Sequence, residues 1–349
     1  MTTEASAAPM NLRADAEIEE ILADPRTGRA AIRAVDLHTH FVPAAYRAAL
    51  AAAGVTHPDG YQAGVPAWSA RDHLDQMDHL GIETSLVSIS SPGPDLGPVT
   101  DTTAVARSAN EAGARLAADH PGRFGFLATL PLPDVDASLK VIEESFDQFG
   151  TRGVALLTHT RGVYLGDQRL EPVMAELGRR RAVVLVHPTE PACLVPGVME
   201  GWSRTMFEFF FDTTRAVTNL IFAGVLERHP GIRLVIPHAG AAIPALAQRI
   251  QRNVLRANRA NRAGRPVPDY LETLRRCYFD VAGSVLPYQL ASLRLLVPDA
   301  NVLYGSDFPF TGHALGAELN ADLRGSEQLS LTDKRAFLRD NALRLLSDD

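Results

Sequence analysis

Five side chains with metal-binding chemistry each stand at or near the end of a short apolar run. They are His38 and His40 in "AVDLHTHF", His187 in "VVLVHPT", His238 in "LVIPHAG" and Asp307 in "NVLYGSDFP". Imidazoles and carboxylates are ligands that Zn²⁺ and similar divalent ions take in proteins. Each residue alone has a plainer explanation, because polar residues often end strands and an aspartate can cap a turn. Their repetition at the ends of separate runs favours one shared metal site.

The positions of these residues depend on the strands that carry them. Eight apolar runs recur along the chain, separated by helical patterns, at 34–41, 84–91, 125–132, 153–159, 183–189, 234–240, 278–283 and 301–309. Several are nearly continuous, which is typical of parallel strands buried on both faces. Eight successive β–α units predict an α/β fold, a (β/α)₈ TIM barrel with its chemistry at the C-terminal strand ends. A doubly wound sheet is the alternative, but the first run is followed by "HTHFVPAAY" and not by a Gly-rich turn.

A barrel would bring the candidate ligands together. Residues two apart on a strand point to the same side, so His38 and His40 can both face the barrel axis. The first, fifth and eighth strands then direct three imidazoles and one carboxylate to a common point. We expect His38, His40, His187 and Asp307 to hold one divalent ion, Zn²⁺ before Mn²⁺, with His238 close by.

The chain divides into a short extension and one large domain. We expect residues 1–33 to form an N-terminal extension, with a short helix around residues 15–23. Residues 34–349 are expected to form the metal-dependent barrel domain. Two long connections, 42–70 and 190–211, follow the first and fifth strands, and long loops on the catalytic rim are typical of lids or oligomer contacts.

Composition limits the partners and the compartment. The net charge is −7, so no basic field favours nucleic acid or an anionic membrane. No apolar run approaches the roughly 18–20 residues of a membrane span, and the acidic N-terminus lacks the features of a secretion signal. The two cysteines lie far apart in the sequence and predict no disulfide framework. These features predict a soluble, cytoplasmic protein.

Several motifs resemble those of a known superfamily. "DLHTHFVP", "VHPTEP", "PHAGAAIPALAQR" and "LYGSDFPF" resemble the amidohydrolase superfamily, in the branch typified by aminocarboxymuconate-semialdehyde decarboxylase. "MDHLGIETSLVSISSPG" and "FFFDTTRA" are similar to the 6-methylsalicylate decarboxylase subgroup, and the resemblance runs from about residue 34 to residue 346. Two-metal members of the superfamily carry a carboxylated lysine at the end of strand four. This chain has only Lys140 and Lys334, so the resemblance implies a single metal.

The resemblance implies a carbon–carbon lyase that decarboxylates a small hydroxyaryl carboxylate such as salicylate or 6-methylsalicylate. In that reaction Asp307 would shuttle the proton to the ring carbon, and His238 would orient water or a substrate oxygen. The alternative is a mononuclear metal-dependent hydrolase acting on a lactone, an amide or a C–C bond, in which Asp307 takes a proton from metal-activated water. A metal-binding or scaffolding protein with a decayed site is a third interpretation, which the complete set of five residues disfavours.

Other residues are candidates for substrate contacts, each with a structural role as the alternative. Arg47, Arg215 and Arg249 could grip a carboxylate, because the guanidinium fork binds it through two hydrogen bonds. We expect Asp212 to cap a helix beside Arg215. Arg249 lies where the resembling branch carries an arginine donated across a dimer interface, so the resemblance implies a homodimer. Trp68, Trp202, Phe210 and Tyr61 are the aromatic side chains that could stack on an aromatic substrate.

Overall fold

The computed structural model describes residues 32–98, 100–262, 264 and 266–347. The predicted extension and its helix around residues 15–23 lie almost wholly outside the described residues. Strand β1 begins at Ala34, where the barrel domain was expected to begin. The division at this point stays a prediction.

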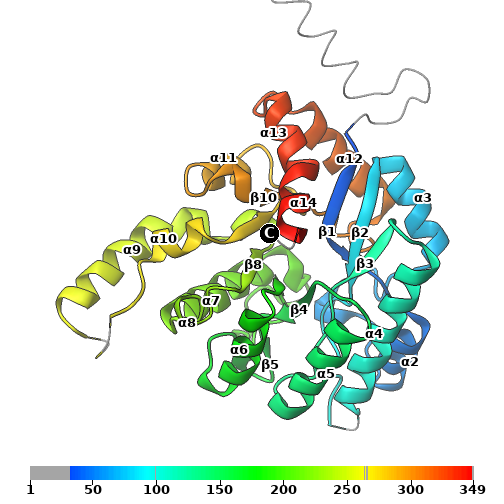
Figure 1. Cartoon of the computed structure of the whole chain (residues 1–349), viewed down its shortest axis with the longest axis horizontal. Coiled ribbons are helices and arrows are strands. Elements are labelled where there is room, and N and C mark those ends of the chain that lie inside the picture. The colour runs from blue at the N-terminus through cyan, green and yellow to red at the C-terminus, as the bar shows by residue number, and fades with distance from the viewer. Residues whose placement is uncertain (1–31, 99, 263, 265, 348–349) are drawn as a thin grey trace, which may run out of the picture.

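Eight parallel strands form a closed ring (Figure 1). Three pair in the order β1-β2-β3 and five in the order β10-β9-β8-β7-β4. Two bridges join these sheets, one between Asp36 and Tyr304 and the other between Ala128 and Val154. The strands are β1 (Ala34–His40), β2 (Ile82–Ser88), β3 (Phe124–Phe126), β4 (Gly153–Leu157), β7 (Val183–His187), β8 (Arg233–Ile236), β9 (Tyr278–Asp280) and β10 (Val302–Leu303). The predicted (β/α)₈ barrel is confirmed.

Helices surround the ring and cover the outer faces of its strands (Figure 1). They are α2 (Ala44–Ala52), α3 (Ala70–Leu80), α4 (Thr102–Asp119), α5 (Val135–Asp147), α6 (Glu171–Arg179), α7 (Glu208–Phe222), α8 (Val225–Arg228), α9 (Ile243–Arg259), α10 (Tyr270–Arg275), α11 (Gln289–Arg294), α12 (Gly312–Gly325), α13 (Leu331–Arg335) and α14 (Asn341–Leu346). A small antiparallel hairpin, β5 (His159–Thr160) with β6 (Val163–Tyr164), follows β4. Among the helices of the described residues, none combines the length and the apolar character that a membrane span requires.

The barrel interior is a packed apolar core and not a pore. Side chains from successive strands meet there, among them Val35, Leu86, Leu127, Leu185 and Leu303. Helix α14 adds Ala342 and Leu345 to the same cluster. This helix lies over the middle of the ring in the view of Figure 1. Helix α14 fills the end of the barrel at which the strands begin. The opposite end, where the strands finish, is therefore the one that a ligand can enter.

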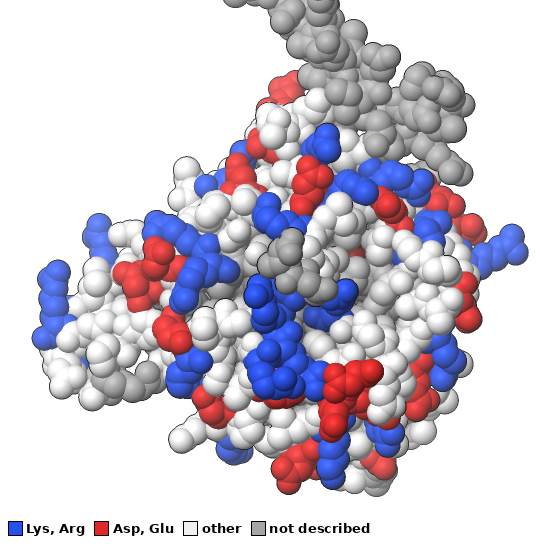
Figure 2. Space-filling model, viewed as in Figure 1, with Lys and Arg blue, Asp and Glu red and all other residues white. Residues whose placement is uncertain are grey.

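The Arg233 side chain holds the end of α14 in place. Figure 2 shows acidic and basic side chains interspersed over this face, with basic ones gathered around its centre. The Arg233 guanidinium donates hydrogen bonds to the carbonyl oxygens of Leu345 and Ser347, and to that of Arg181. These contacts join the end of the chain to the N-terminal ends of the strands.

All eight strands end before the ends of their predicted runs, and at two of them this changes where a candidate ligand lies. Strand β8 ends at Ile236 and β10 at Leu303, so His238 and Asp307 lie on turns beyond them. Both residues have φ of 55°, in the left-handed region that side-chain-bearing residues seldom adopt. Both residues therefore lie in turns that follow their strands. Non-glycine residues in such strained conformations cluster at functional sites.

The long segments after β1 and β7 contact each other. The Asp59 carboxylate accepts a hydrogen bond of 2.8 Å from the amide of Glu190. Asp59 belongs to the short turn Pro58–Gly60, in the connection that follows β1. The connection that follows β7 continues to the turn Arg204–Met206 and then to α7. That these segments act as lids stays a prediction.

The approach of β4 to β7 generates a stability prediction. A Cβ added at Gly153 would lie 2.1 Å from the Val183 carbonyl oxygen, so Gly153→Ala forces the two backbones apart. We expect the free energy of unfolding to fall by about 1–3 kcal/mol, as overpacking of a core does. Urea unfolding measures the change. Gly125→Ala in β3 is the matched control, because its Cβ would meet only Leu86 at 3.6 Å. Equal losses of stability in Gly153→Ala and Gly125→Ala would contradict the conclusion that the close approach of β4 to β7 requires glycine at position 153.

Candidate metal centre

Four side chains converge at the open end of the barrel. His38, His40, His187 and Asp307 each offer a ligand atom, and these atoms all lie within 4.8 Å of one another. Nε2 of His40 lies 3.2 Å from Oδ1 of Asp307, and Nε2 of His38 lies 3.7 Å from the same oxygen. Ligands held about 2.0–2.2 Å from one tetrahedral ion stand at comparable separations. The four residues that the sequence predicted to meet are therefore placed within reach of a single cation.

The hydrogen bonding of the imidazoles fits a metal. Nε2 of His38 and of His40 is buried and makes no hydrogen bond within the described residues. Their other ring nitrogens are engaged, Nδ1 of His38 by the Asp280 carboxylate at 2.9 Å and Nδ1 of His40 by the Ser88 carbonyl at 3.3 Å. Buried nitrogens without a partner are unusual in proteins. A histidine ligand typically donates through one nitrogen and binds the metal through the other.

Asp280 organises the centre and was missed by the sequence analysis. This fully buried residue ends β9, and its Oδ2 accepts from His38 Nδ1. Its Oδ1 accepts from the amides of His238 at 2.9 Å and of Ala282 at 3.0 Å. One carboxylate thus sets the tautomer of a ligand and holds the turn that carries His238. The signal was an aspartate at the end of the apolar run "YFDVAG".

The comparison with protein families decides which family this fold and centre represent. The amidohydrolase family model matches residues 35–347. The chain belongs to the amidohydrolase family. A 6-methylsalicylic acid decarboxylase of Penicillium expansum is 35% identical over 284 residues, which cover 80% of this chain and 86% of that protein. The resemblance of the sequence motifs to this family is confirmed.

Solved structures agree with the assignment. A crystal structure of a protein named amidohydrolase II is 35% identical and has a TM-score of 0.84, covering 90% of this chain and 99% of that chain. A 5-carboxyvanillate decarboxylase of Novosphingobium aromaticivorans, complexed with manganese and 4-hydroxy-3-methoxy-5-nitrobenzoic acid, has a TM-score of 0.79. It is 19% identical and covers 93% of this chain and 98% of that chain. At that identity the likeness shows the fold alone.

Burial and neighbouring charges set the protonation of this amidohydrolase centre. Burial lowers the pKa of His38, but the carboxylates of Asp280, Asp307 and Asp36 outweigh it and raise the pKa to about 9. Burial lowers the pKa of His40 and of His187, so these rings are neutral at pH 7 and present lone pairs. Burial raises the pKa of Asp307, but His238, His40 and His38 outweigh it and hold the pKa well below its usual range. Without a metal, the centre therefore combines an ionised carboxylate and two neutral imidazoles with a protonated His38, and a bound divalent cation would displace the proton of His38.

Aromatic side chains flank the cluster. The Phe210 ring stacks on His238 with 5.8 Å between ring centroids, and the Phe310 ring meets His40 edge-on at 5.5 Å. The Tyr61 hydroxyl donates to the Phe310 carbonyl at 2.6 Å, which joins the segment after β1 to the turn after β10. Of the aromatic candidates, Tyr61 and Phe210 thus lie beside the centre, whereas Trp202 is 59% exposed.

Trp68 and Arg47 make contacts within the protein. The Trp68 indole donates to His73 Nδ1 at 3.0 Å, and its ring packs against Phe41. The Arg47 guanidinium donates to the Pro66 carbonyl and so holds the segment after β1. These contacts give both residues structural roles, and their predicted substrate roles stay predictions.

Arg215 and Arg249 both lie exposed on helices, Arg215 on α7 and Arg249 on α9. The Arg215 side chain pairs with Asp212 at 2.6 Å. The expectation that Asp212 caps a helix is wrong, because Asp212 lies inside α7 and is fully buried. Its carboxylate accepts from the hydroxyls of Thr158 and Tyr164, since burial demands partners for a charge.

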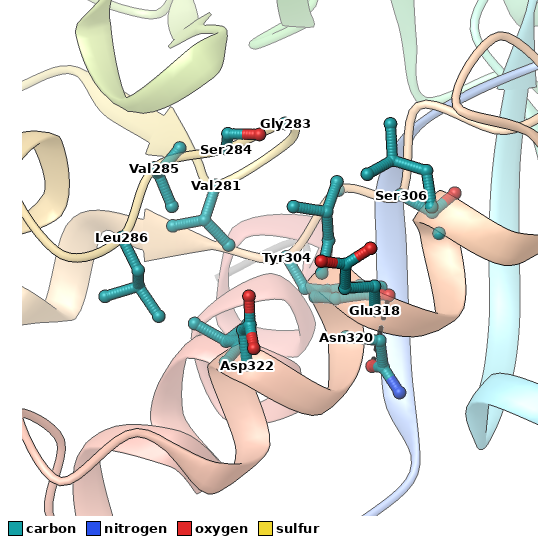
Figure 3. A pocket seen from close by; sticks show the side chains of 15 residues that line it. Val281, Gly283, Ser284, Val285, Leu286, Tyr304, Ser306, Glu318, Asn320 and Asp322 are labelled. Carbon is teal, nitrogen blue, oxygen red and sulfur yellow. Dashed lines mark hydrogen bonds between the residues drawn. The ribbon is translucent and has the colours of Figure 1, made fainter.

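A pocket away from the ligand cluster lies between the segment after β9, the residues that follow β10 and helix α12. Figure 3 shows it between the segment after β9, with Val281 and Val285, and helix α12. Glu318 and Asp322 line the α12 side of this pocket. Their charges would repel an anionic ligand, so we do not assign this pocket to an aromatic carboxylate.

The role of Asp280 generates a metal-binding prediction. Asp280→Asn removes the charge that orients His38, so we expect the affinity for Zn²⁺ or Mn²⁺ to fall roughly 10–100-fold, as for other residues that hold metal-bound histidines. Competition with a chromogenic chelator measures the dissociation constant. Asp78→Asn is the control, since Asp78 is partly exposed and pairs with Arg123 away from the centre. Unchanged affinity in a folded Asp280→Asn protein would remove Asp280 from this role.

Proposed function

We propose that this amidohydrolase is a metal-dependent, non-oxidative decarboxylase of a small hydroxyaryl carboxylate such as 6-methylsalicylate, and that it releases CO₂. The observation that carries the proposal is the single cluster of three imidazoles and one carboxylate at the mouth of the barrel. The relative from Penicillium expansum, a decarboxylase of 6-methylsalicylic acid, supports the choice of substrate class. The hydrolase alternative lacks comparable support among the similar proteins.

His38, His40, His187 and Asp307 would hold one divalent cation. When bound, it supplies a Lewis acid for the substrate carboxylate and its neighbouring phenolic oxygen. We propose Zn²⁺ as the resident ion and Mn²⁺ as the alternative, because both accept imidazole and carboxylate ligands. The end of β4 carries Leu157 and then Thr158, with no lysine to bridge a second ion.

Asp307 is the group suited to move the proton. Its low pKa keeps it ionised at rest, so it first acts as a base and accepts the proton of the substrate phenol. It then donates this proton to the ring carbon that bears the carboxylate. The bond from that carbon to the carboxylate carbon breaks, CO₂ leaves, and the electron pair of the bond restores the aromatic ring.

The two oxygens of Asp307 face different partners. Oδ1 lies toward His38 and His40, whereas Oδ2 lies 3.7 Å from Nε2 of His238. One oxygen can therefore serve as a ligand while the other handles the proton. We infer that His238 holds Oδ2 or a substrate oxygen during the transfer. The rings of Phe210 and Phe310 beside the cluster would exclude water and favour an aromatic ligand.

The proposal also includes the expected substrate contacts, the homodimer, the cellular location and the domain division. We propose that Arg215, Arg47 and Trp68 contact the substrate through movement of the rim, and that Arg249 reaches it from a partner subunit of a homodimer. The exposure of Arg249 on α9 in one chain leaves it available for such a contact. We also propose a cytoplasmic location, and an N-terminal extension of residues 1–33 followed by a barrel domain of residues 34–349.

The first test is substrate turnover. We expect CO₂ release from 6-methylsalicylate, salicylate or 2,6-dihydroxybenzoate, and loss of that release after dialysis against a chelator. Added Zn²⁺ or Mn²⁺ should restore it, and the ion that restores the higher kcat identifies the better cofactor. Turnover of lactones or amides, with none of the three acids consumed, would favour the hydrolase alternative.

The second test separates proton transfer from metal binding. Asp307→Asn should retain much of the bound metal while kcat falls roughly 10²–10⁴-fold, because the amide cannot shuttle a proton. Elemental analysis and CO₂ release measure the two quantities. Asp322→Asn on the exposed part of α12 is the control and should match the wild type. Wild-type turnover by Asp307→Asn would exclude Asp307 from proton transfer.

A further inference from the structure

A small apolar pocket lies beside His187 at the mouth of the barrel. Its lining includes Ile89, Gly93, Leu130, Leu132, Leu157 and His187. The cavity has a volume of about 10 Å³. This is room for one water molecule or one methyl-sized group. His187 belongs to the ligand cluster, so this pocket borders the place where a substrate would bind.

The walls of the pocket are held from several sides. Leu157 ends β4 and pairs in register with His187 of β7. Opposite it stands Gly93, where an added Cβ would lie 2.9 Å from Leu157 Cδ1. The Tyr46 hydroxyl donates to the Gly93 carbonyl at 2.9 Å. The pocket therefore cannot widen without breaking contacts of the segment that contains Gly93.

The chemistry of the lining selects an apolar group. Ile89, Leu130 and Leu132 are buried and offer only aliphatic carbon. Thr129 and Thr160 also line the pocket, and the backbone amide and carbonyl of Thr129 are both engaged by the Asn110 side chain, at 2.8 and 3.0 Å. A charged or strongly polar substituent would lose its hydration here without adequate replacement.

We propose that this pocket receives a methyl substituent ortho to the carboxylate of the aromatic acid, and that Leu157 sets the upper size limit of that substituent. The inference rests on the proposed decarboxylase function and narrows its substrate class. When the carboxylate binds at the ligand cluster, a substituent ortho to it must also lie close to the cluster. The pocket beside His187 is apolar and methyl-sized, so it can accept such a substituent. Salicylate leaves the pocket unfilled, and an ethyl group overfills it.

The test compares three acids that differ only at this position. The values of kcat/KM for salicylate, 6-methylsalicylate and 6-ethylsalicylate are measured for the wild type and for Leu157→Ala. In the wild type we expect the methyl compound to exceed both others by about tenfold or more, as one carbon in an apolar pocket does. In Leu157→Ala the ethyl-to-methyl ratio should rise about tenfold. Leu271→Ala, a partly buried leucine of α10, is the matched control and should leave the ratio unchanged.

Binding of unreactive analogues gives a second measurement. Calorimetry with 3-methyl-2-nitrophenol and 3-ethyl-2-nitrophenol should show the same shift in ratio, and Leu157→Val replaces Leu157→Ala if the latter does not fold. If all three acids are turned over and the ethyl-to-methyl ratio of kcat/KM is the same in the wild type and the Leu157 variants, the pocket assignment is wrong. The proposed decarboxylase function would not be affected by that result. No CO₂ from any acid with the wild type overturns the decarboxylase proposal and the pocket assignment together.

Discussion

The carbonyl oxygen of His38 accepts hydrogen bonds from the amides of Ser306 and Asp307, at 3.1 and 2.8 Å. These bonds join the first strand of the chain to the turn that follows the last one. They hold the Asp307 side chain over the two imidazoles of β1. The ligand cluster therefore depends on closure of the ring, because an open sheet would leave residues 38 and 307 at opposite edges.

The seam between β1 and the last strand also has a steric requirement. A Cβ added at Gly305 would lie 2.8 Å from the Cβ of His38. Below the cluster, the fully buried Asp36 accepts from the amides of His38 and Ser306, and burial raises its pKa to about 7. Asp36 thus holds the backbone on both sides of the seam, and Asp280 orients the His38 imidazole. The centre is thus a consequence of backbone contacts at the seam as much as of the ligand side chains.

The rim of the barrel distinguishes this amidohydrolase from a bare metal site. On one side the Phe210 and Phe310 rings contact His238 and His40. On the other side, at the ends of β2 to β4, aliphatic side chains surround the small pocket beside His187. Apolar side chains around a charged ligand cluster suit a ligand with a flat ring and an anionic edge. In this proposal the cluster carries out the chemistry, and the apolar side chains around it select among aromatic acids.

The sequence alone determined the architecture and the main residues of the centre. Eight apolar runs with helical segments between them predicted the barrel, because strands buried on both faces leave a pattern that needs no tertiary information. The spacing of His38 and His40 predicted a shared side of one strand, since alternation is a local property of the backbone. The absence of lysine from the end of the fourth run could likewise be read directly.

Only the tertiary structure decided how the centre is held. Asp280 lies 242 residues from His38 in the chain. The sequence around either residue therefore does not predict the hydrogen bond between them. The left-handed turns at His238 and Asp307 were read as strand, because the groups that hold their amides, the Asp280 carboxylate and the His38 carbonyl, come from distant parts of the chain. Asp212 was read as a helix cap, yet it is buried inside α7, where its partners are Thr158, which follows β4, and Tyr164 of β6. Periodicity records what a segment buries, whereas long-range packing decides which side chains it meets.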